Sequence, residues 1–245
     1  MGKRIRVQRR GRGGSPYKAS THKRVAPARY PLITKEENER TVNGVIEDFI
    51  HDPGRGTPLA LIRFENGQTC HTVVPEGVYI GQQIKMGRKA PIEIGNILPI
   101  GNIPEGTIVC NIELHPGDGG KIVKSSGAYA TIVAHTPQGT IVKLPSGKTR
   151  YINDKCRATI GVVSAAGRTE KPFLKAGSKF HLMKAKGHKY PRTRGRAMIA
   201  AVHPYGSSKR SARKGTTVPR TAPPGQKVGL IAAKGAGQKR KRKAR

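Results

Sequence analysis

The chain has 245 residues, with 47 Lys and Arg against 14 Asp and Glu, and a formal net charge of +33. A free globule with so much charge of one sign would repel itself, so the charge indicates a polyanionic partner, most commonly nucleic acid. The N-terminus lacks an apolar stretch and no run reaches 18 apolar residues. We therefore expect neither a signal peptide nor a transmembrane helix.

The charge is unevenly distributed along the chain. Residues 1–30 carry 10 basic and no acidic residues, residues 31–160 carry 14 basic and 13 acidic, and residues 161–245 carry 23 basic and one acidic. A nearly neutral middle flanked by cationic ends is typical of a folded module with basic arms. The arms hold too little apolar surface to fold alone, so we expect order there only on a polyanion.

The first β region is expected after an extended N-terminal arm of residues 1–35, in which Tyr17 and Tyr30 could stack on bases. Glycines and a proline between residues 11 and 16 argue against a helix in this arm. Short strands are predicted at 44–50, 58–65, 68–74 and 78–84, with a hairpin turn at Asn66-Gly67. The loop at 52–58 presents Arg55 at its tip.

A second β region is predicted at 107–163. Apolar and other residues alternate over 107–114 and 156–163, and further strands are expected at 129–134, 139–144 and 148–152. The strand spacing indicates an all-β fold with two small barrels in series. The implied domains are a basic arm at 1–35, a barrel at 36–86, a linker at 87–104, a barrel at 105–165 and a basic C-terminal extension at 166–245, with a short helix over 174–186.

Motifs for catalysis or metal binding are weak. Cys70, Cys110 and Cys156 form no CxxC pair, which favours buried reduced thiols over zinc or a disulfide framework. The eight histidines show no ligand spacing and no nucleophile elbow is present, so we expect no metal, no cofactor, no small-molecule substrate and no enzyme activity. The run Ser146-Gly147-Lys148-Thr149 ends like a P-loop, but Val142 replaces the required glycine and the pattern reads as a hairpin turn.

The Gly-rich loop at 115–121 has two interpretations. It is either a long hairpin connection or a backbone that approaches a phosphate closely, with help from Lys121 and Lys124. The basic cluster at 239–243 could be a nuclear import signal, but that leaves the other cationic segments unexplained.

Several motifs carry a family resemblance. The run NIELHPGDGG at 111–120 closely resembles the NIELxPGxGG signature of the universal large-subunit ribosomal protein L-two family. LPSG at 144–147, CRATIG at 156–161 and GRAM at 195–198, followed by VHP at 202–204, match in order and spacing.

The C-terminal tail points to one branch of that family. The run APPGQKVGLIAA at 222–233 resembles the archaeal and eukaryotic members. After the His-Pro element, this chain has Gly206-Ser207-Ser208 where the family usually has a glycine triplet.

The resemblance implies an OB-like barrel, then an SH3-like barrel, then an extension threaded into rRNA. It implies a cytoplasmic protein of the large ribosomal subunit, with roles in assembly, subunit association, tRNA binding and the peptidyl transferase region. The implied partners are large-subunit rRNA and neighbouring ribosomal proteins, with the small subunit and tRNA contacted transiently and no membrane. The predicted RNA-binding residues are Arg55, Lys121, Lys124, Arg192, Arg194, Arg196, His203, Lys209, Arg210, Arg213 and Lys214.

The charge and His203 suggest two rival functions. A DNA-packaging protein satisfies the charge, but DNA wrapping does not require two turn-rich barrels of near-neutral charge. An enzyme using His203 would need a reachable partner and a tuned pKa, and the sequence shows neither. His203 is therefore expected to pack or to contact RNA.

Overall fold

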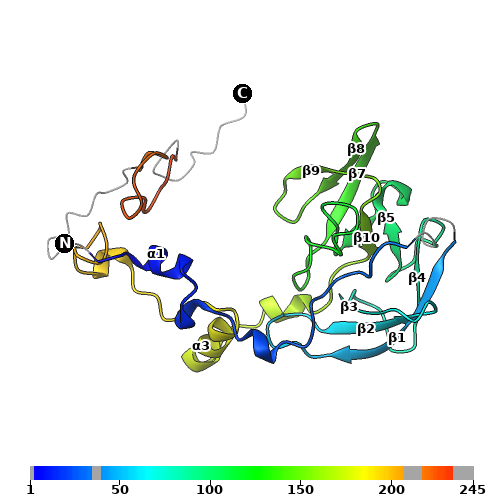
Figure 1. The fold of residues 1–245 in the computed structure, drawn as a ribbon, viewed down its shortest axis with the longest axis horizontal. Coiled ribbons are helices and arrows are strands. Elements are labelled where there is room, and N and C mark those ends of the chain that lie inside the picture. Colours follow the sequence, from blue (N-terminus) through cyan, green and yellow to red (C-terminus); the bar gives the residue numbers. More distant parts are fainter. Residues whose placement is uncertain (1–2, 35–39, 207–216, 234–245) are drawn as a thin grey trace. The chain divides into compact units, whose positions relative to one another are not determined.

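The computed structural model describes residues 3–34, 40–206 and 217–233, and it divides the chain into two compact units (Figure 1). One unit is formed by residues 21–174. The other combines the two ends of the chain, residues 1–20 and 175–245. Since the two units are not placed relative to one another, each is described by itself. Among the described residues, no helix is long and apolar enough to cross a membrane.

The unit of residues 21–174 is built on ten strands, so the expected all-β class is confirmed. They form one sheet in the order β3-β2-β1-β4-β5-β10-β6-β7-β8-β9. In chain order the strands are β1 (Val42–Ile50), β2 (Leu59–Phe64), β3 (Thr69–Val73), β4 (Gln83–Met86), β5 (Ile97–Pro99), β6 (Ile108–Cys110), β7 (Ala130–Thr136), β8 (Gly139–Lys143), β9 (Thr149–Ile152) and β10 (Arg157–Ile160).

The first strands follow the expected hairpin pattern. Strands β2 and β3 pair antiparallel, with Leu59 opposite Val73 and Arg63 opposite Thr69. Gly67 in their turn has φ +78°, a conformation that suits glycine and explains the Asn-Gly turn. Strand β1 pairs with β2 on one side and with β4 on the other. The strand expected at 78–84 is displaced, because residues 78–81 form a turn and β4 begins at Gln83.

Strand β10 is central to the second half. It pairs with both β5 and β6, and all four of its residues are buried. The segment expected as a linker, 87–104, contains β5, which also pairs with β4. The alternation expected for 107–114 is not found, because Ile108 is 41% exposed while the five consecutive residues 109–113 are all buried.

Two apolar cores support this sheet. The first contains Ile46, Phe64, Ile84 and Met86 with other residues of the first four strands. The second contains Ile112, Ile132 and Val142 and lies mostly among residues 98–163. Tyr30, which could have stacked on bases, is instead 5% exposed within the first core, where its large ring buries apolar surface.

The unit formed by the two chain ends holds short elements. Helix α1 (Arg6–Gly11) lies within the arm that was expected to be extended, so that expectation is wrong at these residues. Helix α3 (Ala176–Ala185) confirms the predicted C-terminal helix, and Gly187, at φ +68°, lies just beyond its last turn. The turns η1 (Ser15–Tyr17) and η5 (Gly195–Ala197) also belong to this unit. Among its described residues, Ile5 and Val228 are the buried hydrophobic side chains, so its apolar core is small.

Candidate nucleic-acid interface

The Gly-rich loop at 115–121 is shaped by one buried carboxylate. Glu113 is fully buried, and its oxygens accept hydrogen bonds from the backbone N–H groups of Gly117 (3.3 Å), Gly119 (2.9 Å) and Arg157 (2.9 Å). Gly117 and Gly119 adopt φ of +83° and +78°, a conformation that suits glycine and lets both N–H groups point at the carboxylate. The loop is therefore folded around Glu113 rather than being an open connection.

Arg157 neutralises that carboxylate inside the protein. Its Nη2 atom donates to Glu113 Oε1 at 2.9 Å, and both side chains are almost completely buried. The same Nη2 atom donates to the carbonyl of Pro31 at 2.8 Å, and the guanidinium lies 5.3 Å from the centre of the Tyr30 ring. The pair thus fixes the end of the N-terminal segment against the Gly-rich loop.

Tyr30 completes this attachment. Its hydroxyl donates to the carbonyl of Asn111 at 2.7 Å and contacts the Thr159 hydroxyl, while its backbone N–H donates to the carbonyl of Gly119 at 3.0 Å. Burial raises the pKa of the Tyr30 hydroxyl well above its ordinary value, so the group remains a donor at neutral pH. The neighbouring Arg29, whose side chain is exposed, is thereby placed beside the Gly-rich loop.

The loop at 52–58 is held by an ion pair. Arg55 Nε donates to Oδ2 of the buried Asp52 at 2.6 Å, and the Arg55 side chain is 23% exposed. Arg55 Nη2 also reaches the carbonyl of Ala26 at 3.5 Å. Arg55 is therefore partly buried at its guanidinium, whereas sequence analysis placed it at a free loop tip.

Lys124 connects the N-terminal segment to the Gly-rich loop. Its ammonium donates to the carbonyls of Ala28 and Gly120. Burial, followed by the charges of Arg55, Lys121 and Arg29, lowers the pKa of Lys124 to about 8. The structure thus brings together the three predicted residues Arg55, Lys121 and Lys124, and adds Arg29.

Two more arginines, Arg24 and Arg168, pack on glycines of the 52–58 loop and extend this basic surface. A Cβ atom built on Gly54 would lie 2.3 Å from Arg24 Nε, and one built on Gly56 would lie 2.5 Å from the Arg168 guanidinium. These arginines therefore lie directly on the backbone of the 52–58 loop. Arg168 also donates to the Ser126 hydroxyl through Nη2 at 2.7 Å. We call this set the loop cluster: Arg24, Arg29, Arg55, Lys121, Lys124 and Arg168.

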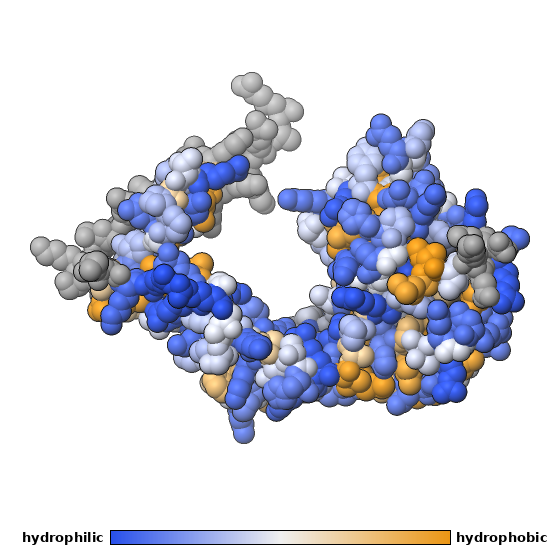
Figure 2. All heavy atoms as spheres, in the orientation of Figure 1, coloured by the Kyte–Doolittle hydropathy of each residue, from blue (hydrophilic) through white to orange (hydrophobic). Residues whose placement is uncertain are grey.

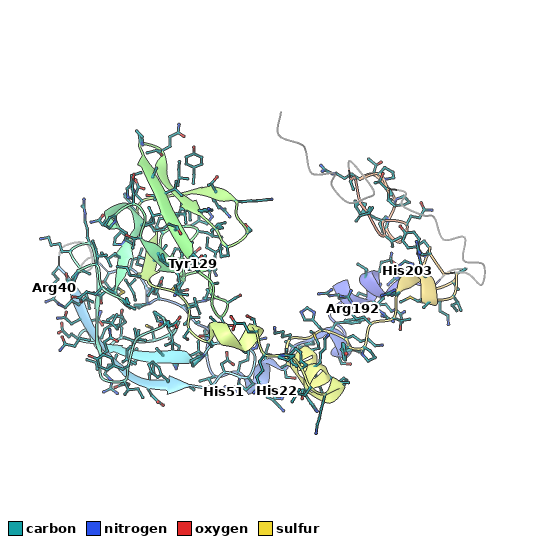
Figure 3. The ribbon with its side chains drawn as sticks, turned by 180° about the vertical axis from the view of Figure 1, so that it is seen from behind. His22, Arg40, His51, Tyr129, Arg192 and His203 are labelled. Carbon is teal, nitrogen blue, oxygen red and sulfur yellow. The ribbon has the colours of Figure 1, made fainter. Side chains whose placement is uncertain are left out.

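A second basic site lies in the unit formed by the chain ends. A cavity of about 470 Å³ is lined by the cations Arg6, Arg10, Lys189, Arg192 and Arg194, by His188 and His203, and by Val7, Tyr17, Thr193, Gly195 and Met198. Arg192 and His203 are labelled in Figure 3. We call it the end pocket. It combines cations for phosphate with an aromatic ring, Tyr17, that a base could stack on.

His203 is packed and hydrogen-bonded in one orientation. Its ring lies so close to Gly195 that an added Cβ there would be 2.3 Å from Cε1. Its Nδ1 atom accepts from the backbone N–H of Tyr205 at 3.0 Å. Burial and the charge of Arg6 lower the pKa of His203, so the neutral ring is favoured, with the proton on Nε2.

The other predicted RNA-binding residues belong to neither the loop cluster nor the end pocket. Arg196 is exposed in η5 but does not line the end pocket. Lys209, Arg210, Arg213 and Lys214 lie outside the described residues. Sequence analysis missed Glu113 and Arg157, although both stand inside the motifs that carry the family resemblance. The signal that could have revealed them is that each is a single charged residue within an otherwise largely apolar predicted strand.

Other predicted features can be compared directly. The three cysteines are free and buried, and burial raises the pKa of each thiol to about 12, as expected for inert thiols. Ser146 and Gly147 lie in the turn between β8 and β9, which confirms the hairpin interpretation over a P-loop. Within the described ranges, no group of three or more His, Cys, Asp or Glu residues could hold a metal ion.

Comparison with known proteins agrees with this architecture. Residues 1–86 match the family model described as Ribosomal Proteins L2, RNA binding N-terminal domain. Residues 93–227 match the model of the Ribosomal Proteins L2, C-terminal domain. The chain belongs to the ribosomal protein L2 family.

Archaeal members of the L2 family are similar over nearly the whole chain. The protein named large ribosomal subunit protein uL2 of Thermofilum pendens is 52% identical over 242 residues, covering 98% of this chain and 97% of its own. The uL2 of Korarchaeum cryptofilum is 49% identical over 245 residues, covering 100% and 99%. The uL2 of Methanocaldococcus jannaschii is 52% identical over 239 residues, covering 97% and 99%. The chain is thus an archaeal-type L2 protein of the large ribosomal subunit and not an enzyme.

Proposed function

We propose that this L2 protein binds large-subunit rRNA through the loop cluster and the end pocket. The observation that carries the proposal is the gathering of cations in the loop cluster, where the Lys124 ammonium donates to the backbone carbonyls of Ala28 and Gly120 and lies near Arg55, Lys121 and Arg29. The nearby carboxylates are Asp52, which is buried against Arg55, and Asp118, so the six cations of the cluster outnumber them. Phosphate groups would supply the missing negative charge.

The end pocket supports the same proposal by a different chemistry. Its lining contains five Lys or Arg side chains and no acidic residue, and Tyr17 and Met198 add an aromatic and an apolar surface. An unstacked nucleotide needs both a phosphate contact and a stacking surface, and single-stranded RNA segments supply such nucleotides. The pocket volume of about 470 Å³ is in the range of small-ligand sites.

The finer roles follow from this binding. We propose that the protein supports assembly of the large subunit, subunit association, tRNA binding and the peptidyl transferase region in the cytoplasmic ribosome. We also propose the domain division given above, with a barrel at 36–86 and another at 105–165. The two apolar cores support that division. A marked preference for folded rRNA over duplex DNA would separate this function from DNA packaging.

Substitutions in the loop cluster test the proposal. Arg55→Ala and Lys124→Ala should each weaken binding of the full chain to rRNA by roughly 1–3 kcal/mol, the range for lost charged contacts. Arg63→Ala is the matched control, because Arg63 is an exposed arginine paired with Glu47 at 2.7 Å on the β1–β2 hairpin. Affinity should be measured by filter binding over a salt series, with unfolding measured in parallel. If the cluster variants bind like the control, the loop cluster is not an rRNA site.

A further inference from the structure

One face of the unit of residues 21–174 differs from the rest of the surface. Tyr79, Ile80, Ile92 and Ile94 are 66%, 56%, 51% and 51% exposed. Figure 2 shows the surface of this protein as largely hydrophilic, with separate hydrophobic patches. Four large apolar side chains in two short segments are more than the scattered single residues that need no explanation.

The two segments that carry these side chains are joined by defined contacts. The Gln82 side chain joins the two segments, since its Oε1 atom accepts from the Tyr79 N–H at 3.2 Å and its Nε2 atom donates to the Ile94 carbonyl at 3.2 Å. A Cβ atom on Gly95 would lie 3.1 Å from Val78 Cγ1, so the Val78 side chain packs on the Gly95 backbone. We call the surface of Tyr79, Ile80, Ile92 and Ile94 the isoleucine face.

The isoleucine face continues toward the second half of the sheet. A Cβ atom on Gly161 would lie 3.3 Å from Ile94 Cγ2, and the Gly161 N–H donates to the carbonyl of Ile108 at 2.9 Å. Ile108 is itself 41% exposed. The Ile94 side chain therefore rests on Gly161, just after β10, and the backbone beneath it is hydrogen-bonded to β6 (Ile108–Cys110).

The two segments that form this face carry acidic residues and no basic ones. Residues 75–82 and 91–97 contain Glu76 and Glu93 and neither Lys nor Arg, whereas residues 83–90 between them contain Lys85, Arg88 and Lys89 and the chain has a net charge of +33. Both glutamates are exposed. The basic residue Lys85, on β4, lies at the edge, where its backbone N–H donates to Asn96. Carboxylates repel phosphates, and three of the four apolar side chains are isoleucines, which offer RNA neither charge nor a stacking surface; Tyr79 alone has a ring on which a base could stack.

We propose that the isoleucine face docks a basic segment of another ribosomal protein. The segment would place apolar side chains on Tyr79, Ile80, Ile92 and Ile94 and would bring Lys or Arg side chains to Glu76 and Glu93. An apolar centre with a charged rim is the usual composition of a protein–protein interface. This proposal rests on the proposed function in one respect: the protein must be assembled into the large subunit, where it meets other ribosomal proteins.

Site-specific crosslinking tests the class of partner. Tyr79→p-benzoylphenylalanine is introduced into the full chain, which is assembled into large subunits and irradiated. The crosslinked product should resist ribonuclease and should contain a protein segment rich in Lys or Arg. Tyr17→p-benzoylphenylalanine is the control, because Tyr17 lines the end pocket. If the proposed function holds, the control should crosslink to rRNA, so its failure reports on that function separately.

A charge reversal tests the chemistry of recognition. Glu76→Lys with Glu93→Lys, combined with the crosslinker at position 79, should reduce the protein crosslink at least tenfold while the variant still enters subunits. The same double reversal without the crosslinker should leave rRNA affinity unchanged or increased. A crosslink from position 79 to rRNA, to a second copy of this chain, or to nothing in fully assembled subunits would overturn the proposal. An undiminished crosslink after charge reversal would overturn it as well.

Discussion

At the scale of single residues, Glu113 decides the shape of the Gly-rich loop. Its carboxylate is enclosed by backbone N–H groups and by the Arg157 guanidinium, with no exposure to solvent. A buried charge is tolerated when it is paired and hydrogen-bonded, and becomes costly when its partner is removed.

Glu113→Gln therefore should destabilise the protein by roughly 3–5 kcal/mol, because it leaves the buried Arg157 charge without its counter-ion. The measurement is the free energy of unfolding of the full chain in urea. Glu170→Gln, at an exposed position, is the control and should change stability by less than about 0.5 kcal/mol. Equal stabilities of the two variants would show that the loop does not depend on the ion pair.

His203 separates an architectural role from a chemical one. Its Nδ1 atom is occupied by the Tyr205 N–H and its Nε2 atom carries the proton, so the ring has no free lone pair to act as a base. His203→Gln should leave peptide-bond formation within about tenfold of wild type, whereas a general base would contribute roughly 10²–10⁴-fold.

The measurement for His203 is single-turnover peptidyl transfer on purified, fully assembled variant ribosomes. His203→Ala serves as the more disruptive comparison, because it removes the ring that packs on Gly195. A hundredfold loss for Gln in particles of normal composition would reverse the non-enzymatic assignment of this residue.

At the scale of elements, sequence patterns predicted the local turns better than the long-range pairing. The Asn66-Gly67 hairpin and the turn at 145–147 follow from local chemistry, and both are found. Strand β5 and the central position of β10 depend on partners distant in the chain, so local alternation could not reveal them. The loop cluster was partly predicted, since Arg55 and Lys124 were chosen on charge, but the burial of both side chains depends on tertiary packing.

That burial makes the loop cluster sensitive to pH. The pKa of Lys124 lies at about 8, so the free protein loses this charge as the pH rises from 7 to 9. Phosphate favours the charged form, so rRNA affinity should fall up to about tenfold over this range. The depressed pKa also means that the charged form of Lys124 is less favourable in the folded protein than in the unfolded chain. The free energy of unfolding should therefore rise with pH from about 8, where folded Lys124 loses its proton, and level off above the ordinary lysine pKa of about 10.4.

Lys124→Arg isolates that effect, because arginine stays charged throughout this range. The pH dependence of rRNA binding should be weaker in Lys124→Arg than in wild type, and Lys121→Arg should retain the wild-type dependence. The change in rRNA affinity between pH 7 and pH 9 is measured in the same salt for all three proteins. Any titration of the RNA contributes equally to each, so it drops out of the comparison. An identical slope in all three would remove Lys124 from the interface.

At the scale of the whole molecule, charge and apolar surface are separated between the two units. Residues 1–20 and 175–245 contain no Asp or Glu, so all 14 acidic residues belong to residues 21–174. Nearly all buried hydrophobic side chains among the described residues lie in that same unit. The basic ends were evident from composition, but their association into one unit was not, because it joins segments more than 150 residues apart.

This separation predicts how the free protein responds to protease. The unit formed by the chain ends has a small apolar core and strong internal repulsion, so its folding should depend on rRNA. Limited trypsin digestion of the free protein should remove both ends and leave a product near residues 21–174, slightly longer than the predicted span of the two barrels and their linker, 36–165. Bound rRNA should protect the ends, and 1 M salt should abolish that protection by screening phosphate contacts. Mass spectrometry of the products identifies the boundaries. Equal survival of the ends with and without rRNA would show that they fold by their own packing, and the end pocket would then exist before RNA arrives.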